Sequence, residues 1–230
     1  KEAAASKEIH FALRLSVLTS TVSTIIVVTL AMPAAYALTR TPMPFKRIYS
    51  LIIDLTLSLP YILLGLSLLI LFSSPWGKWL KAHHIQVVFS PLGIVMVHLL
   101  INLPYALRLI RSAFESADIH LEYIAMTLGA TPLTAFLTIL LPMCRNSLIN
   151  AFILTWSRAL GEFGATLMLV GVTRFKTETL PGSIYLNIST GQNDIAMATA
   201  MIMLVISGIT LFLSRILTDP SRDKNRKVGI

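Results

Sequence analysis

The chain has 230 residues, of which 55% are hydrophobic and only 13% are charged, with a mean hydropathy of +0.75 and a formal net charge of +8. A soluble domain of this length could not bury so much apolar surface, so the composition excludes that class and indicates an integral membrane protein. The single cysteine, Cys144, excludes an internal disulfide and is typical of a small buried residue.

Long apolar runs predict an all-α, polytopic membrane protein, because lipid requires each segment to satisfy its own backbone polar groups. No alternation of apolar and polar residues typical of a barrel is visible. We expect a single transmembrane domain over residues 1–230, with about five spans near residues 11–38, 48–72, 87–109, 145–172 and 195–217. Because the chain begins at Lys1 rather than at a methionine, a sixth span upstream of Lys1 stays open.

The segments between the spans carry most of the charge. The basic turn "RTPMPFKR" starts at Arg40, and "SSPWGKWLKAHH", from Ser73, has the tryptophans and lysines of a short interfacial helix. Eleven of the nineteen Lys and Arg residues lie on the side that holds this basic turn, the segment after span three and the C-terminal tail. By the positive-inside rule this side is cytoplasmic, and attraction to anionic lipid then explains the net charge without nucleic acid.

The segment of about residues 114–142 contains no apolar run of the roughly 20 residues that a crossing needs, and Pro132 and Pro142 divide it. We therefore expect it on the cytoplasmic surface. Its pattern predicts one short helix that stops at Gly129 and a second that starts after Thr131. Two helices joined at a glycine form a protruding elbow.

One face of the first elbow helix is expected to be exposed, because Tyr123, Met126 and Thr127 fall at three- and four-residue spacing. Such a face suits a groove on another protein. The alternative is a helix that lies on lipid, but such helices usually carry a basic face. Here the charges are Asp118 and Glu122, which favours a protein partner.

The elbow residues resemble the "EAA" signature of ABC importer permeases. Tyr123-Ile124-Ala125 is followed by Gly129 and, after nine intervening residues, by "ILLP" at Ile139–Pro142, which matches the spacing of the signature. Tyr123 occupies the position of the usual glutamate, and Glu122 precedes it by one residue. A second stretch, "ALGEFGAT" from Ala159 to Thr166, is similar to permeases for molybdate, tungstate and sulfate.

This resemblance implies a homodimeric type I importer permease in the cytoplasmic membrane, with two cytoplasmic ABC ATPase subunits and an external solute-binding protein as partners. The chain itself would be no enzyme and hold no cofactor, since ATP and Mg²⁺ would bind the ATPase; it has no Gly-rich phosphate loop. The elbow would be the coupling helix. Its implied contacts with the ATPase are Glu122, Tyr123, Ala125, Met126, Thr127, Leu128, Gly129 and Ala130.

Charged residues within spans are costly and need an explanation. Arg158 and Glu162 stand four apart, so mutual neutralisation is the favoured interpretation, while a positive charge near the dimer axis would favour an oxyanion. Asp54 is expected to pair with Arg40 or Arg47. Small residues and prolines suit either helix packing or a gate. The gate and pathway candidates are Pro60, Arg158, Gly161, Glu162, Gly164 and Thr166.

Three other functions compete with an oxyanion permease. An ABC permease for phosphate or an amino acid would share the elbow and differ in its binding protein. An ion-coupled secondary carrier commonly shows an internal repeat, and none is visible. An intramembrane enzyme would need a nucleophile and base or a set of metal ligands, which the sparse His, Asp and Glu residues do not supply.

Overall fold

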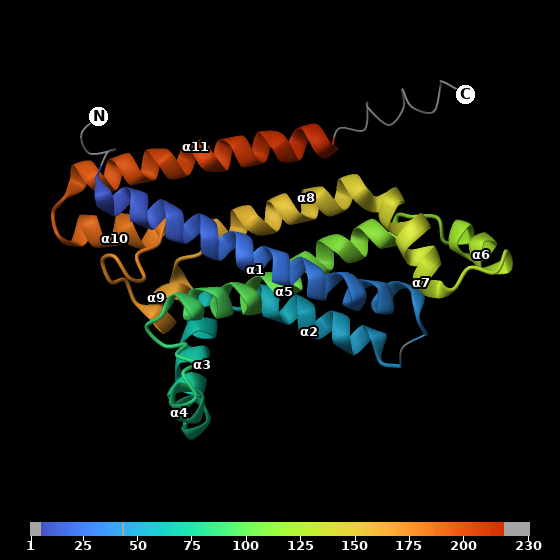
Figure 1. Ribbon diagram of the computed structural model, residues 1–230, viewed down its shortest axis with the longest axis horizontal. Coiled ribbons are helices and arrows are strands. Elements are labelled where there is room, and N and C mark those ends of the chain that lie inside the picture. The colour runs from blue at the N-terminus through green and yellow to red at the C-terminus, as the bar shows by residue number, and fades with distance from the viewer. Residues whose placement is uncertain (1–5, 43, 219–230) are drawn as a thin grey trace.

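The computed structural model describes residues 6–42 and 44–218, and all regular elements in these ranges are helical (Figure 1). In chain order the helices are α1 (Lys7–Arg40), α2 (Lys46–Ser58), α3 (Tyr61–Ser73), α4 (Pro75–Ala82), α5 (Pro91–Glu115), α6 (Ile119–Thr127), α7 (Pro132–Ala135), the π-helical η2 (Phe136–Leu140), α8 (Leu141–Leu160), α9 (Gly164–Val170), α10 (Leu180–Ser189) and α11 (Asn193–Thr218). The possible span upstream of Lys1 and the basic tail beyond Thr218 lie outside the described residues.

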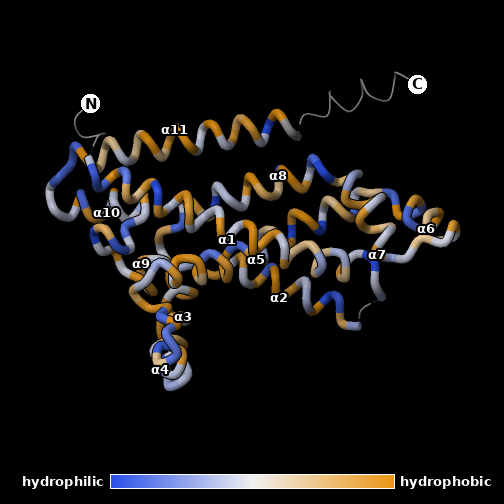
Figure 2. The backbone as a smooth tube through the Cα atoms, viewed as in Figure 1, coloured by the Kyte–Doolittle hydropathy of each residue, from blue (hydrophilic) through white to orange (hydrophobic). Residues whose placement is uncertain are grey.

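Four helical runs are long and apolar enough to cross a membrane, namely Lys7–Arg40, Pro91–Glu115, Pro132–Leu160 and Asn193–Ile216, and the bent pair α2–α3 brings the number to as many as five. The four long runs lie roughly along the long axis of the molecule, with α6 at one end and α10 at the other, while α3 projects away from this axis (Figure 1). Hydrophobic residues dominate α11 and the middle of α8 (Figure 2). The fold is therefore the expected all-α, multi-pass one.

Small side chains allow α1 and α5 to pack closely along their length. The α1 face towards the core buries serine, threonine and alanine, including Ser20, Ser23, Ala31 and Ala35. Small residues bring membrane helices close together, because no hydrophobic effect drives their association within lipid. Ser23 Oγ lies 3.1 Å from His98 Nδ1 on α5, so a polar contact adds to the packing.

The predicted span at residues 48–72 differs from the structure, because α2 and α3 are bent by 102° at their junction. Pro60 has no N–H to donate, and the preceding residue, Leu59, adopts extended angles (φ −73°, ψ 141°) instead of helical ones. The chain restarts as α3 with Pro60 at the N-cap. A sharp break therefore divides the single span that the sequence predicted.

The predicted span at residues 145–172 also differs, at both ends. The helical run begins at Pro132, because the N–H of Leu141 bonds to the carbonyl of Phe136 in a π-helical turn that accommodates Pro142. At the other end α8 stops at Leu160, and α9 starts only at Gly164. The surface elbow is thus shorter than residues 114–142, since its predicted second helix is the beginning of a span.

We expect Gly65→Ala to destabilise the protein by about 1–3 kcal/mol, since overpacking has a cost of this order. A Cβ at Gly65 would lie 2.5 Å from the Cα of Ala165, where α3 crosses α9. Thermal unfolding in detergent measures the effect. In the control Gly208→Ala the new methyl meets no atom within 4 Å, so equal loss in both variants would contradict this packing.

Candidate functional site

The helix α6 projects at one end of the molecule, beside the C-terminal end of α1 (Figure 1). Asp118 caps its N-terminus by accepting a hydrogen bond from the N–H of His120 at 2.9 Å. At its C-terminus the N–H of Ala130 bonds to the carbonyl of Ala125, and that of Gly129 to Met126. These two bonds form a Schellman motif, with Gly129 at φ +95°.

The predicted docking residues on α6 do not all face outward. Tyr123 and Leu128 are 51% and 84% exposed, and Thr127 and Gly129 are also exposed. Ala125, Met126 and Ala130 are half-buried. Glu122 is only 2% exposed, so it faces the protein instead of a partner.

The sequence interpretation missed two exposed apolar residues on α6, Leu121 and Ile124. Together with Leu128 they line an open groove of about 550 Å³, whose other wall contains Ile139 and Pro142. Their three- and four-residue spacing was the available signal. The exposed face of α6 is therefore an apolar surface, with Tyr123 beside it.

Glu122 forms an ion pair with Arg40 at the end of α1, with 2.8 Å between Nε and Oε1. Arg40 was instead expected near Asp54, which is exposed and forms no ion pair within the described residues. The two partners are 82 residues apart in the chain, so tertiary packing and not sequence proximity brings the end of α1 to the elbow. Spacing rules give no signal for such a pair.

The helices that follow the two chain breaks, α3 and α9, pack against each other. Pro60 caps α3, and Gly161 ends α8. Gly164 starts α9 beside Ile62, whose Cγ1 would lie 3.1 Å from a Cβ added there. The structure therefore places Gly164 beside the first turn of α3, which follows Pro60, whereas a Cβ added at Gly161 would be nearest to Met203.

Arg158 lies between two tyrosines that the sequence interpretation did not single out. Its guanidinium carbon is 5.1 Å from the ring centroid of Tyr61 on α3 and 4.6 Å from that of Tyr105 on α5. Cation–π contacts of this kind hold the guanidinium in place. The buried Arg158 Nε has no hydrogen-bond partner within the described residues, so this donor is available.

Arg158 and Glu162 form no ion pair within the described residues, but their charges still interact electrostatically, as the sequence suggested. Glu162 is 8% exposed, and its Oε1 accepts a hydrogen bond from the N–H of Ala165 at 2.9 Å. The helix ends at Leu160, so Glu162 is not one turn above Arg158 on a common helix. Thr166, also buried, lies in the first turn of α9.

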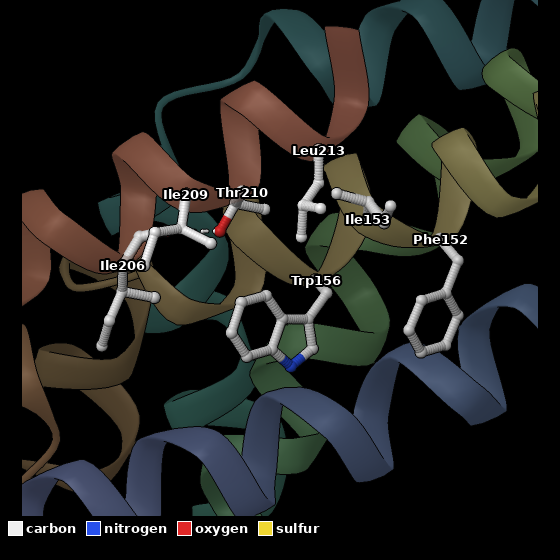
Figure 3. A pocket seen from close by; sticks show the side chains of 7 residues that line it. All are labelled: Phe152, Ile153, Trp156, Ile206, Ile209, Thr210 and Leu213. Carbon is white, nitrogen blue, oxygen red and sulfur yellow. Dashed lines mark hydrogen bonds between the residues drawn. The ribbon is translucent and has the colours of Figure 1, made fainter. Parts of the chain in front are cut away.

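A second groove, of about 270 Å³, lies between α8 and α11 and is almost wholly apolar (Figure 3). Side chains from both helices line it, and the indole of Trp156 lies at its base. Trp156 Nε1 donates to Thr21 Oγ1 on α1 at 3.0 Å, which fixes the ring. The groove contains no charged group, so an ionic solute has no partner there. Within the described part of the chain, no group of three His, Cys, Asp or Glu residues could hold a metal ion.

The fold is similar to that of a solved ABC transporter. Over 93% of this chain and 79% of the other, it matches the crystal structure of a bacterial alginate ABC transporter in complex with an alginate pentasaccharide-bound periplasmic protein, with a TM-score of 0.73 and 16% identity. At this identity the likeness shows the fold alone. The class that the fold defines is that of helical, multi-pass membrane proteins.

The sequence assigns the chain to a family. Residues 27–221 match the family described as binding-protein-dependent transport system inner membrane component. The chain is 34% identical to the molybdenum transport system permease protein ModB of Mycobacterium tuberculosis, over 87% of this chain and 76% of that one. It is 32% identical to the sulfate transport system permease protein CysT of Escherichia coli, over 85% and 70%. The chain therefore belongs to this family and is a multi-pass permease subunit of an ABC importer.

Proposed function

We propose that this chain is the membrane-spanning subunit of an ATP-driven importer for a tetrahedral oxyanion, with molybdate or tungstate first and sulfate second. The observation that carries the proposal is the Arg158 guanidinium, placed between Tyr61 and Tyr105 where two spans break. The printed names of the relatives, a molybdenum and a sulfate permease, support the same substrate class.

The chemistry at Arg158 suits a small anion in transit. A tetrahedral oxyanion offers several acceptor oxygens, and guanidinium N–H groups recognise such oxygens well. The guanidinium supplies the donors, and no carboxylate lies within ion-pair distance of it in the described residues, although the charge of Glu162 still interacts with it. A single arginine attracts the anion without holding it tightly, which transport requires, since a strongly bound ion would leave slowly.

The energy for transport would come from ATP hydrolysis by partner subunits, which assemble with this chain at the cytoplasmic membrane. In this proposal two copies of the chain form the pathway, an external binding protein delivers the solute, and two ABC ATPase subunits bind ATP and Mg²⁺. The α6 face with Tyr123, Ile124 and Leu128 supports the ATPase contact, because it is exposed and largely apolar. Closure of the ATPase dimer would displace α6 and switch the spans between two packings of similar energy.

Uptake by vesicles tests the proposal. The chain is reconstituted with its ATPase and binding protein, and accumulation of molybdate, tungstate, sulfate, phosphate and an amino acid is measured. We expect oxyanion uptake that requires ATP inside the vesicles, on the side of the ATPase subunits. This uptake should persist after ion gradients are dissipated. Uptake of an amino acid alone would contradict the oxyanion assignment, and gradient-driven uptake by the chain without ATP would favour a secondary carrier.

The choice among oxyanions needs a second measurement. Molybdate, tungstate and sulfate share charge and shape, so the contacts at Arg158 cannot separate them strongly. Calorimetry on the cognate binding protein with each anion is expected to show the preference. Tighter binding of sulfate than of molybdate would favour the second candidate.

A further inference from the structure

Arg40, the last residue of α1, contacts three elements at once. Its Nε donates to Glu122 Oε1 at 2.8 Å, and its Nη2 donates to the carbonyls of Phe114 at 2.9 Å and Ala117 at 3.2 Å. Phe114 lies in the last turn of α5, where free carbonyls favour a cation, and Ala117 lies in the link to α6. One guanidinium thus joins the end of α1, the end of α5 and the first turn of α6.

This ion pair is shielded from solvent. The side chains of Arg40 and Glu122 are 10% and 3% exposed, so water hardly screens their attraction. A carboxylate in the first turn of a helix is also favoured by the helix dipole. Separation of the two groups would leave a buried charge without its partner, which is strongly unfavourable.

Aromatic rings hold the surroundings of the pair in place. Tyr36 on α1 packs edge-to-face against Phe136 of η2, with centroids 4.9 Å apart, and Phe114 packs against the same ring at 6.0 Å. By contrast, the covalent link from α6 to α7 turns at Gly129, around which no atom lies within 4 Å of an added Cβ. Since α6 otherwise packs mainly against α7 and η2, the polar contacts of Arg40 are what link α6 to the ends of α1 and α5.

We propose that Arg40 and Glu122 are positioning residues that lock α6 to the ends of α1 and α5, so that these three elements move as one body when the ATPase moves α6. The proposal rests on the proposed function for its source of motion. The lock itself is a property of this chain. A movement of α6 would then move α1 and α5 directly. The face of α1 that packs on α5 is lined by small residues.

The test measures a distance within the chain and the yield of transport. Spin labels are attached to cysteines introduced at Thr41 and at His120 on α6, both exposed, in a Cys144→Ser background. In the full complex we expect a narrow distance that ATP does not change, while the His120–His120 distance between two copies does change. In Glu122→Gln the Thr41–His120 distribution should broaden, and oxyanion transported per ATP hydrolysed should fall by about fivefold or more, the size of a typical coupling between sites.

A nearby ion pair supplies the control. Glu115→Gln removes a contact to Arg111 that is exposed and lies within one helix, so both readouts should stay unchanged. Arg40→Lys, which keeps the charge but not the fork, should give an intermediate loss. A narrow distance in Glu122→Gln, or an ATP-dependent Thr41–His120 distance in the native pair, would overturn the lock. If no distance changes when ATP is added, the proposed function fails. The width of the distance distribution between Thr41 and α6 in Glu122→Gln, measured without ATP, still tests the lock.

Discussion

Arg158→Ala is expected to reduce ATP-dependent oxyanion uptake by about tenfold or more. A hydrogen bond that involves a charged group contributes roughly 1.5–3 kcal/mol, and about 1.4 kcal/mol corresponds to a factor of ten. The substitution removes both the charge and the unpartnered Nε between Tyr61 and Tyr105. Initial uptake rates in reconstituted vesicles, normalised to folded protein, measure the effect.

Two further variants separate transport from packing. Arg145→Ala removes an exposed arginine from the other end of α8, so uptake should stay near the native rate. Arg158→Lys retains a charge but lacks the planar group that stacks on the rings, so a partial loss is expected. If Arg158→Ala lowers stability in detergent but leaves uptake per folded molecule unchanged, Arg158 is a packing residue.

Gly129→Val is expected to abolish most coupling between ATP hydrolysis and uptake while the protein still inserts and folds. Gly129 has φ +95°, a conformation that costs an ordinary residue roughly 1–2 kcal/mol and a β-branched one more. No atom lies within 4 Å of an added Cβ, so the effect comes from the backbone and not from a clash. The turn would rearrange and move the exposed face of α6. The ratio of solute transported to ATP hydrolysed measures the loss.

The chain offers a matched control at its opposite end. Gly191 ends α10 in the same way, with φ +77°, no atom within 4 Å of an added Cβ, and a bond from the Gln192 N–H to the Asn187 carbonyl. Gly191→Val should have a similar effect on stability but leave the coupling ratio unchanged. Gly129→Asn should keep most coupling, because asparagine tolerates this conformation. Equal uncoupling by both valine variants would refute a specific role of the elbow.

Local rules worked where one segment decides its own structure. The helix stop at Gly129 follows from the glycine itself, which adopts φ +95°. The same rules failed where a neighbouring turn could compensate. Pro142 was expected to end a helix, but the helix continues through it. The π-helical turn before it shifts the backbone hydrogen bonding, so that the missing N–H of Pro142 is tolerated.

Long-range contacts explain the other differences. The four-residue spacing of Arg158 and Glu162 suggested an ion pair, yet the helix ends between them and Arg158 stacks on rings from α3 and α5. Glu122 was expected to face a partner, yet Arg40 from the end of α1 draws it inward. Neither contact can be read from spacing, because each depends on which helix ends meet.

The sequence by itself determined that this is a helical membrane protein with a glycine-hinged elbow, since hydrophobic length and backbone conformation are properties of single segments. Only the tertiary structure decided how the elbow is fastened and where the charge within the spans points. Those features depend on side chains from helices far apart in the chain, whose approach is set by packing and by the need to pair buried charges.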